Sequence, residues 1–142
     1  MLHIIDNIYL SNLRDAENFT LIRENNIKIV CRLSEDHNVS IYGSLVLFYN
    51  FECEDNILSG DDMLTAAKTI FTMIDQTEHN VLVHCNEGQS SSVSVIIYYM
   101  MIKHGYSFNE SLEYIKSIKS DIKPNSAFKK KLIGIENNQH HE

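Results

Sequence analysis

Hydrophobic and polar positions divide the chain into short apolar segments and longer segments with helical periodicity. Four of the short segments are rich in β-branched or aromatic residues and have polar residues on both sides, which is typical of strands. These predicted strands cover residues 8–10, 27–33, 45–51 and 81–84. The spacing of apolar residues predicts helices over residues 14–25, 62–76 and 108–119. Residues 91–103 are apolar on nearly every side, so we expect them to form a helix buried at the centre of the fold.

The alternation of strands and helices predicts an α/β fold. Right-handed crossovers between successive strands place helices on both faces of a parallel sheet. We therefore expect a central, mostly parallel sheet of four to five strands flanked by helices. Ligands of such sheets bind beyond the carboxyl ends of the strands. The polar tail, residues 137–142, is expected to be frayed.

Length and composition agree with a single domain. The 142 residues include one proline and five glycines and show no internal repeat or low-complexity tract. A chain of this length buries a sufficient core without disulfides. Its apolar segments are all shorter than the roughly 20 residues of a membrane span. The N-terminal residues lack the features of a secretion signal, so the expected location is the cytoplasm or the nucleus.

Charge and metal-binding patterns narrow the function. The formal net charge of −7 argues against nucleic-acid binding, because nucleic-acid-binding proteins concentrate Lys and Arg. Cys31, Cys53 and Cys85 are an odd number without CxxC spacing, which favours reduced thiols over disulfides or a zinc site. The carboxylates between residues 52 and 62 lack the spacing of a calcium loop. We expect no metal and no cofactor.

Residues 81–94 form the most informative segment, an apolar strand that runs through a short polar loop into a helix. In a tight turn of this kind, successive backbone N–H groups converge on one point, and the helix N-terminus adds roughly half a positive charge. The loop can therefore hold an anion. The same field favours the thiolate form of Cys85, which is the form that attacks phosphorus. Gly88 permits the backbone to reverse.

The loop resembles the signature of the dual-specificity class of cysteine-dependent protein tyrosine phosphatases, which is His-Cys, five residues, Arg and then Ser or Thr. Five residues match the signature in register: His84, Cys85, Gly88, Ser90 and Ser92. The resemblance implies that Cys85 is the nucleophile and that the Ser92 hydroxyl helps the thiolate leave. It implies a supporting role for His84. The implied phosphate-binding loop consists of Asn86, Glu87, Gly88, Gln89, Ser90 and Ser91.

Ser91 stands at the position where the family has arginine. In the family, this arginine grips two phosphate oxygens and stabilises the charge of the transition state, which suits a planar bidentate cation. Serine cannot do this. The arginine fingers of other phosphoryl-transfer enzymes are worth roughly 10³–10⁵ in rate. Glu87 adds a negative charge that disfavours a dianionic substrate unless its side chain points away. The vacant arginine position therefore argues against efficient catalysis.

The resemblance extends over about residues 4–136. Residues 8–12 and 27–30 look like the first strands of the family, and residues 123–128 look like its Pro-Asn-x-x-Phe element, in which Asn125 has a supporting role. The general acid of the family lies on a loop some thirty residues before the cysteine, so Asp55 is the candidate. Asp61 and Asp62 are expected to cap the following helix instead.

Simpler interpretations stay open for several of these residues. Cys85 could be a small buried hydrophobic residue, and Asp55 could be a solvated surface acid. Ser90 and Ser92 could cap the helix. For Arg32, one hypothesis is that it reaches toward the loop and there either pairs with Glu87 or Asp55 or partly replaces the missing guanidinium. The alternative is an arginine at the strand edge, in solvent or in a surface ion pair.

Three functional hypotheses follow. The leading one is a pseudophosphatase that binds a protein partner, either phosphorylated on Tyr or Thr or docked through another surface. The second is a slow phosphatase that retains Cys85 and Asp55 and uses Arg32 or a lysine for charge. The third is an active phosphatase in which Ser91 is an introduced replacement for arginine. No nucleic-acid or membrane partner is expected.

Overall fold

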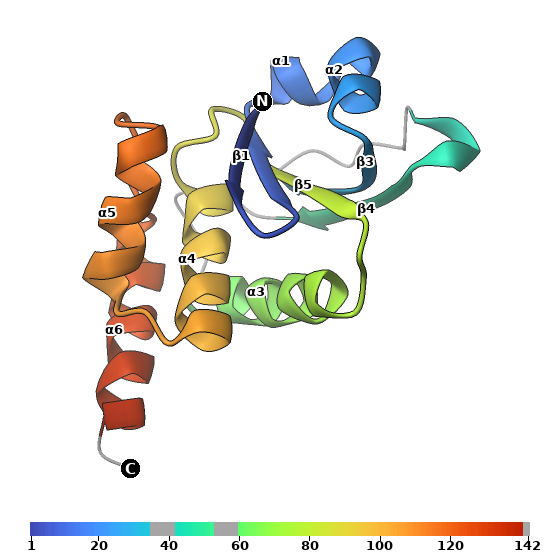
Figure 1. Ribbon diagram of the computed structural model, residues 1–142. Helices are drawn as coiled ribbons and strands as arrows, with labels where there is room; N and C mark the ends of the chain where they lie inside the picture. Colours follow the sequence, from blue (N-terminus) through green and yellow to red (C-terminus); the bar gives the residue numbers. More distant parts are fainter. Residues whose placement is uncertain (35–41, 53–59, 141–142) are drawn as a thin grey trace.

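A five-stranded sheet forms the centre of the computed structural model, which describes residues 1–34, 42–52 and 60–140 (Figure 1). Along the chain the elements are β1 (Leu2–Ile5), β2 (Ile8–Ser11), α1 (Leu13–Ala16), α2 (Phe19–Glu24), β3 (Ile27–Ser34), the 3-10 helix η1 (Gly43–Leu45), β4 (Leu47–Glu52), α3 (Gly60–Asp75), β5 (Asn80–His84), α4 (Ser91–His104), α5 (Phe108–Ile118) and α6 (Ser126–His140). The strand order is β1-β2-β5-β3-β4, with β1 antiparallel to β2 and the other pairs parallel. The predicted mostly parallel α/β sheet is confirmed.

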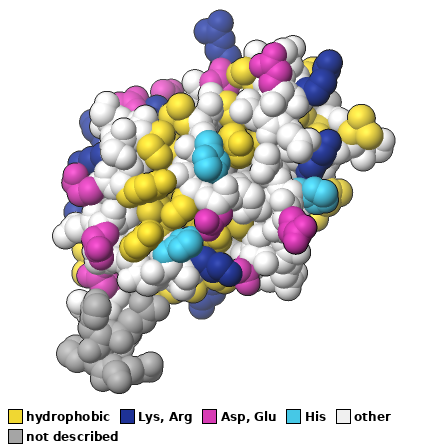
Figure 2. Space-filling model, in the orientation of Figure 1, with side chains coloured by type: hydrophobic (Ala, Val, Ile, Leu, Met, Phe, Trp, Pro, Cys, Tyr) yellow, Lys and Arg dark blue, Asp and Glu magenta, His cyan; other side chains and the backbone are white. Residues whose placement is uncertain are grey.

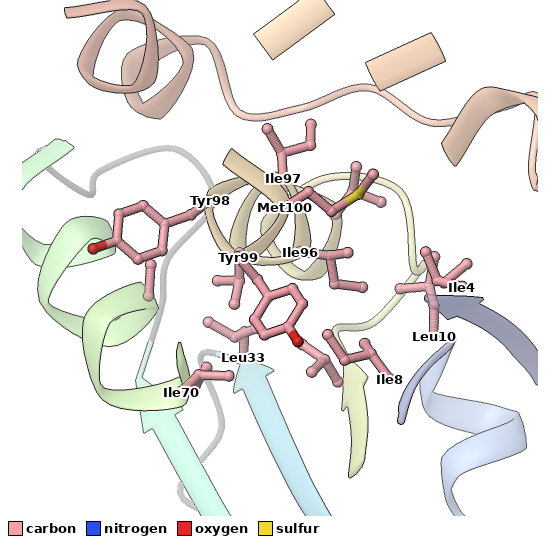
Figure 3. Close-up of a cluster of buried hydrophobic side chains, with 14 of the residues drawn as sticks. Ile4, Ile8, Leu10, Leu33, Ile70, Ile96, Ile97, Tyr98, Tyr99 and Met100 are labelled. Atoms are coloured by element: carbon pink, nitrogen blue, oxygen red, sulfur yellow. The ribbon is translucent and has the colours of Figure 1, made fainter. Parts of the chain in front are cut away.

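The larger hydrophobic core lies between the sheet and helices α3 and α4, and it continues on the far side of α4 to α5 and α6 (Figure 1). Alternation along β3 directs Cys31 and Leu33 into this core, while Val30 belongs to a second cluster on the other face. Figure 3 shows Ile96 of α4 directed toward the strands, whereas Ile97 points to the opposite side of the helix. Both side chains are fully buried. The prediction that residues 91–103 form a central buried helix is therefore confirmed.

The second cluster covers the other face of the sheet with α1, α2 and the segment before β4. Its buried members are Ala16, Ile22, Ile27, Val30, Tyr42 and Leu82. Tyr42 ties this layer together because its hydroxyl donates a hydrogen bond of 2.6 Å to the carbonyl oxygen of Ala16. Both faces of the sheet are thus covered, as a parallel sheet requires.

The prediction of one continuous helix over residues 14–25 is wrong. Two short helices, α1 and α2, replace it because Asn12 and Asn18 each cap a new helix. Asn12 Oδ1 accepts a hydrogen bond from the Asp15 N–H group, and Asn18 Oδ1 accepts from two N–H groups in the first turn of α2. Phe19, predicted on the buried face, is 51% exposed at the start of α2.

Other element boundaries also differ from the predictions. β1 was not predicted, and it pairs with β2 through a turn in which Asp6 has a φ of 51°. Helix α3 begins at Gly60, so Asp61 lies inside its first turn rather than capping it, and it pairs with Lys131 of α6 at 2.7 Å. Helix α6 continues to His140, so most of the tail that we expected to be frayed is helical. None of the described helices is long and apolar enough to cross a membrane.

Candidate functional site

The candidate site lies at the carboxyl end of β5, in the middle of the sheet. β5 pairs with β2 on one side and with β3 on the other, and His84 is level with Ser11 and Arg32. The chain leaves β5 at Cys85, forms a loop, and enters α4 at Ser91. This is the place where parallel α/β sheets bind ligands.

The Cys85 sulfur lies inside this loop, and residue Cys85 as a whole is 5% exposed. The Gly88 N–H group donates a hydrogen bond to Sγ at 3.2 Å, and the Ser92 hydroxyl oxygen lies 3.0 Å from Sγ. The loop backbone and the first turn of α4 therefore both contact the sulfur. The Ser92 hydroxyl also lies where it could stabilise a departing thiolate, which is the role that the family resemblance implied.

Gly88 is required by the geometry of the loop. Its φ is 72°, and a Cβ atom at this position would lie 2.9 Å from the carbonyl oxygen of Ser11. The loop therefore packs its backbone directly against the end of β2, which a larger residue would prevent.

Backbone hydrogen bonds hold the loop from two sides. The Leu13 N–H group donates to the Asn86 carbonyl at 2.9 Å, and the Lys123 N–H group donates to the Gln89 carbonyl at 2.7 Å. On the second side, Gln89 Nε2 also donates to Asp121 Oδ2 at 2.9 Å. The start of α1 and the connection between α5 and α6 thus fix the shape of the loop.

Ser94 joins α4 to this connection, although no role was predicted for it. Its hydroxyl donates to the Ser90 carbonyl at 2.8 Å and accepts a hydrogen bond of 3.0 Å from the Asn125 N–H group. Asn125 in turn caps α6, because its Oδ1 accepts from the Phe128 N–H group at 3.0 Å. The available signal for Ser94 was a serine four residues after Ser90, a spacing at which a helical hydroxyl can reach back to a carbonyl.

Ser90 occupies the N-cap position of α4, but its side chain makes no capping hydrogen bond. The interpretation of Ser90 and Ser92 as ordinary side-chain caps is therefore wrong for Ser90, and the Ser92 hydroxyl instead contacts Cys85. Ser91 is the first residue of α4 and is 1% exposed. Asn86 and Glu87 are exposed, so the charge of Glu87 is solvated.

His84 lies directly beneath the loop and is fully buried. Burial, aided by the nearby charge of Arg32, lowers the pKa of His84 from 6.5 to about 4. The ring is therefore neutral near pH 7. Nε2 accepts a hydrogen bond of 3.4 Å from Arg32 Nε, and Nδ1 lies 3.3 Å from the Cys85 carbonyl oxygen. This pattern assigns the proton to Nδ1 and makes His84 a support of the Cys85 backbone.

Arg32 is neither in solvent nor paired with Glu87. It is 3% exposed, and its guanidinium lies 5.3 Å from the centroid of the Phe48 ring. Its Nη2 atom is 3.9 Å from Glu17 Oε1, a side chain of the connection between α1 and α2. Because successive side chains of a strand point to opposite faces of the sheet, Arg32 lies on the face opposite to that of Cys31. The ring of His84 lies between Arg32 and the Cys85 carbonyl, so Arg32 supports the loop from behind.

The remaining candidate residues either fall outside the described residues or form no functional site. Asp55, the proposed general acid, falls outside the described residues, and so does its alternative pairing with Arg32. Cys31 is fully buried, and burial raises the pKa of its thiol to about 12, so it is chemically quiet. Within residues 1–34, 42–52 and 60–140, no three His, Cys, Asp or Glu side chains are grouped to hold a metal ion.

Sequence comparisons agree with this geometry. The family model described as "Dual specificity phosphatase, catalytic domain" matches residues 8–138. The putative tyrosine phosphatase 123R of Invertebrate iridescent virus 6 is 29% identical over 138 residues, which cover 94% of this chain and 89% of the viral protein. Dual specificity protein phosphatase 22-A of Danio rerio is 29% identical over 91% of this chain and 62% of its own length. The match to protein phosphatase Slingshot of Drosophila melanogaster covers 88% of this chain but 12% of the length of Slingshot.

Solved structures share the fold. DUSP15 has a TM-score of 0.85 at 20% identity, covering 96% of this chain and 86% of its own. Human DUSP28 has a TM-score of 0.83 at 16% identity, covering 99% of both chains. The human tyrosine phosphatase-like serine/threonine/tyrosine-interacting protein has a TM-score of 0.82 at 19% identity, covering 97% of this chain and 96% of its own. The thiol loop after β5, its support by His84 and the match over residues 8–138 lead to one conclusion: the chain belongs to the dual specificity phosphatase family.

Proposed function

We propose that this chain is a pseudophosphatase, a dual-specificity phosphatase domain that binds protein partners and hydrolyses phosphate esters poorly. One observation carries the proposal. Ser91 occupies the arginine position of the signature, at the buried start of α4. A short neutral hydroxyl supplies neither the charge nor the fork geometry that two phosphate oxygens require.

Binding and catalysis depend on different parts of the loop. Backbone N–H groups and the start of α4 attract an anion in its ground state as well as in its transition state. Catalysis needs interactions that strengthen in the transition state, which in this family the bidentate arginine supplies. Losing such a group costs roughly 10³–10⁵ in rate by comparison with arginine fingers. The loop therefore retains more capacity to bind phosphate than to turn it over.

The partner that fits this loop is a protein phosphorylated on Tyr or Thr. Bound in the loop, the phosphorylated residue would be shielded from active phosphatases. A precedent for binding on this fold comes from the human relative whose name describes it as phosphatase-like and serine/threonine/tyrosine-interacting. Docking through a surface away from the loop is the alternative form of the same proposal.

A weakly active enzyme is the second candidate. The observation that favours it is the Cys85 sulfur, which keeps both the Gly88 N–H donor at 3.2 Å and the Ser92 hydroxyl at 3.0 Å. A sulfur held in this arrangement has little value to a protein that only binds. A phosphatase disabled by an introduced Ser91 would show the same geometry.

An activity assay distinguishes these candidates. The purified chain, Ser91→Arg and Cys85→Ser are assayed with an aryl phosphate, and Cys85→Ser defines the background. We expect the unmodified chain to match the background. Activity in Ser91→Arg alone would identify a disabled catalytic site. Activity of the unmodified chain well above Cys85→Ser would show that the pseudophosphatase proposal is wrong.

A binding assay tests the other half of the proposal. A phosphotyrosine peptide, a phosphothreonine peptide and their unphosphorylated forms are titrated into the unmodified chain, with inorganic phosphate as competitor. We expect tighter binding of a phosphorylated form and its displacement by phosphate. Equal affinity for phosphorylated and unphosphorylated forms would rule out phosphate recognition by the loop.

A further inference from the structure

A second concave site lies between α2, the start of β3 and η1, and we call it the α2–η1 cavity. Its volume is about 300 Å³, at the lower end of the range of ligand pockets. The apolar part of its lining consists of Phe19, Ile22, Ile27, Tyr42, Leu45 and Val46. Phe19 packs edge-on against Tyr42, with ring centroids 6.1 Å apart.

The α2–η1 cavity is separate from the phosphate loop. Ile27, which lines the cavity, is level with Asn80 at the start of β5, whereas Arg32 is level with His84 at its end. Five residues along an extended strand span about 16 Å. The Ile27 side of the cavity and the phosphate loop therefore lie at opposite ends of the parallel strands. Tyr42, which also lines the cavity, interacts with Arg32.

The charge of the cavity is opposite to that of the whole chain. Among the described residues that line the cavity, only Arg23 and Lys28 are charged, although the formal net charge of the chain is −7. Both are exposed, and neither forms an ion pair with any residue that the structure describes. Glu24 follows Arg23 in α2 but does not line the cavity, because adjacent helical residues point in different directions. The two cations are thus available to an acidic partner.

Exposed apolar side chains extend from the cavity along the sheet edge. Leu45 is 84% exposed and Phe19 51%, and on β4 Leu47 is 56% and Tyr49 41% exposed. In Figure 2, hydrophobic and basic side chains lie together at the upper right edge, where α2 and η1 lie in Figure 1. β4 is the last strand of the described sheet and carries no Lys or Pro, which usually protect such edges. An extended peptide can bind beside a strand of this kind.

We propose that the α2–η1 cavity docks an extended acidic segment of a protein partner. One large apolar side chain of the segment enters the cavity, and neighbouring carboxylates face Arg23 and Lys28. Nucleic acid fits less well, because two cations neutralise too few phosphates for stable binding. This docking does not depend on phosphate recognition at the Cys85 loop. For a partner that engages both sites, the second contact raises the overall affinity through effective concentration.

The test uses a fluorescein-labelled peptide of aspartates and glutamates with one central phenylalanine, titrated into the full chain by fluorescence anisotropy. The charge-reversal variant Arg23→Glu/Lys28→Glu is compared with Lys68→Glu/Lys130→Glu, which makes the same change in net charge at two exposed lysines outside the cavity. We expect the first variant to weaken binding by about tenfold or more and the control by less than about twofold. Thermal unfolding verifies that both variants are folded.

Three results would overturn the proposal. Equal weakening in both variants would mean that only net charge matters. Equal binding of a peptide with serine in place of phenylalanine would mean that no apolar side chain enters the cavity. The absence of saturable binding to the unmodified chain would contradict a docking site outright. Inorganic phosphate is expected not to compete, so failure here is distinguishable from failure of phosphate recognition at the Cys85 loop.

Discussion

Arg32 Nε donates a hydrogen bond to His84 Nε2 across 3.4 Å, in a buried layer beneath the phosphate loop. The other nitrogen of the same ring lies 3.3 Å from the Cys85 carbonyl oxygen. Arg32 also stacks over Phe48, with its guanidinium carbon 5.3 Å from the ring centroid. A buried cation on β3 thus sets the tautomer and the orientation of the histidine that supports the loop.

Removal of the Arg32 charge should raise the pKa of His84. The variant Arg32→Met retains length and loses the guanidinium, so the positive charge that lowers the pKa of His84 is gone. We expect the pKa to rise from about 4 but to stay below 6.5, because burial is the larger cause of the shift. An NMR titration of the ring protons measures it, with the exposed Lys28→Met on the same strand as control. An unchanged pKa in Arg32→Met would show that the two side chains are not coupled.

Burial of neutral His84 should make the fold less stable in mild acid. Its pKa is about 4 in the folded chain and near 6.5 when unfolded, so between these pH values the unfolded state binds more protons. This contribution is complete above pH 6.5 and is lost as the pH falls toward 4. Its upper limit is about 3 kcal/mol.

Urea unfolding at several pH values measures this dependence. We expect His84→Gln to flatten the decrease in the free energy of unfolding below pH 6.5. The matched variant His79→Gln replaces an exposed histidine and should keep the profile of the unmodified chain. Identical profiles for all three proteins would assign the acid sensitivity to other groups.

Gly88 should tolerate alanine much less than Gly105 does. Both have nearly the same φ, 72° and 71°, but a Cβ atom on Gly88 would lie 2.9 Å from the Ser11 carbonyl oxygen, while Gly105 has nothing within 4 Å. Gly105→Ala should lower the free energy of unfolding by about 1 kcal/mol, which is the cost of left-handed backbone. Gly88→Ala adds the clash and should lower it by about 3 kcal/mol. Equal losses in urea unfolding would show that the loop can move away from β2.

Cys31 should resist alkylation in the folded chain. It is fully buried, and burial raises the pKa of its thiol to about 12, so almost no thiolate is present at pH 8. The Cys85 sulfur lies inside the phosphate loop, where it contacts the Gly88 N–H group and the Ser92 hydroxyl. Iodoacetamide labelling followed by peptide mass spectrometry should modify Cys85 before Cys31, and Cys31 only after unfolding in urea. Rapid labelling of Cys31 under native conditions would mean that the core beneath the sheet opens readily.

Much of the fold was predictable because its signals are local. Apolar spacing predicted the helices now seen as α3, α4 and α5, and the all-round apolar character of α4 predicted its central position. The pattern of residues 81 to 94 predicted the strand, loop and helix now seen as β5, the Cys85 loop and α4. The break at Asn18 was missed, because a side-chain cap interrupts a helix without changing its apolar spacing. β1 was missed because a four-residue strand carries too little pattern of its own.

The sequence by itself determined the α/β class, the buried helix α4 and the thiol loop with Ser91 at the arginine position, because these depend on residues close together in the chain. Only the tertiary structure decided where Arg32 points and that Ser94 joins α4 to Asn125. It also brought Arg23 and Lys28 to the rim of one cavity. These relationships depend on strand register and on contacts between elements far apart in the chain, which no local spacing of residues encodes.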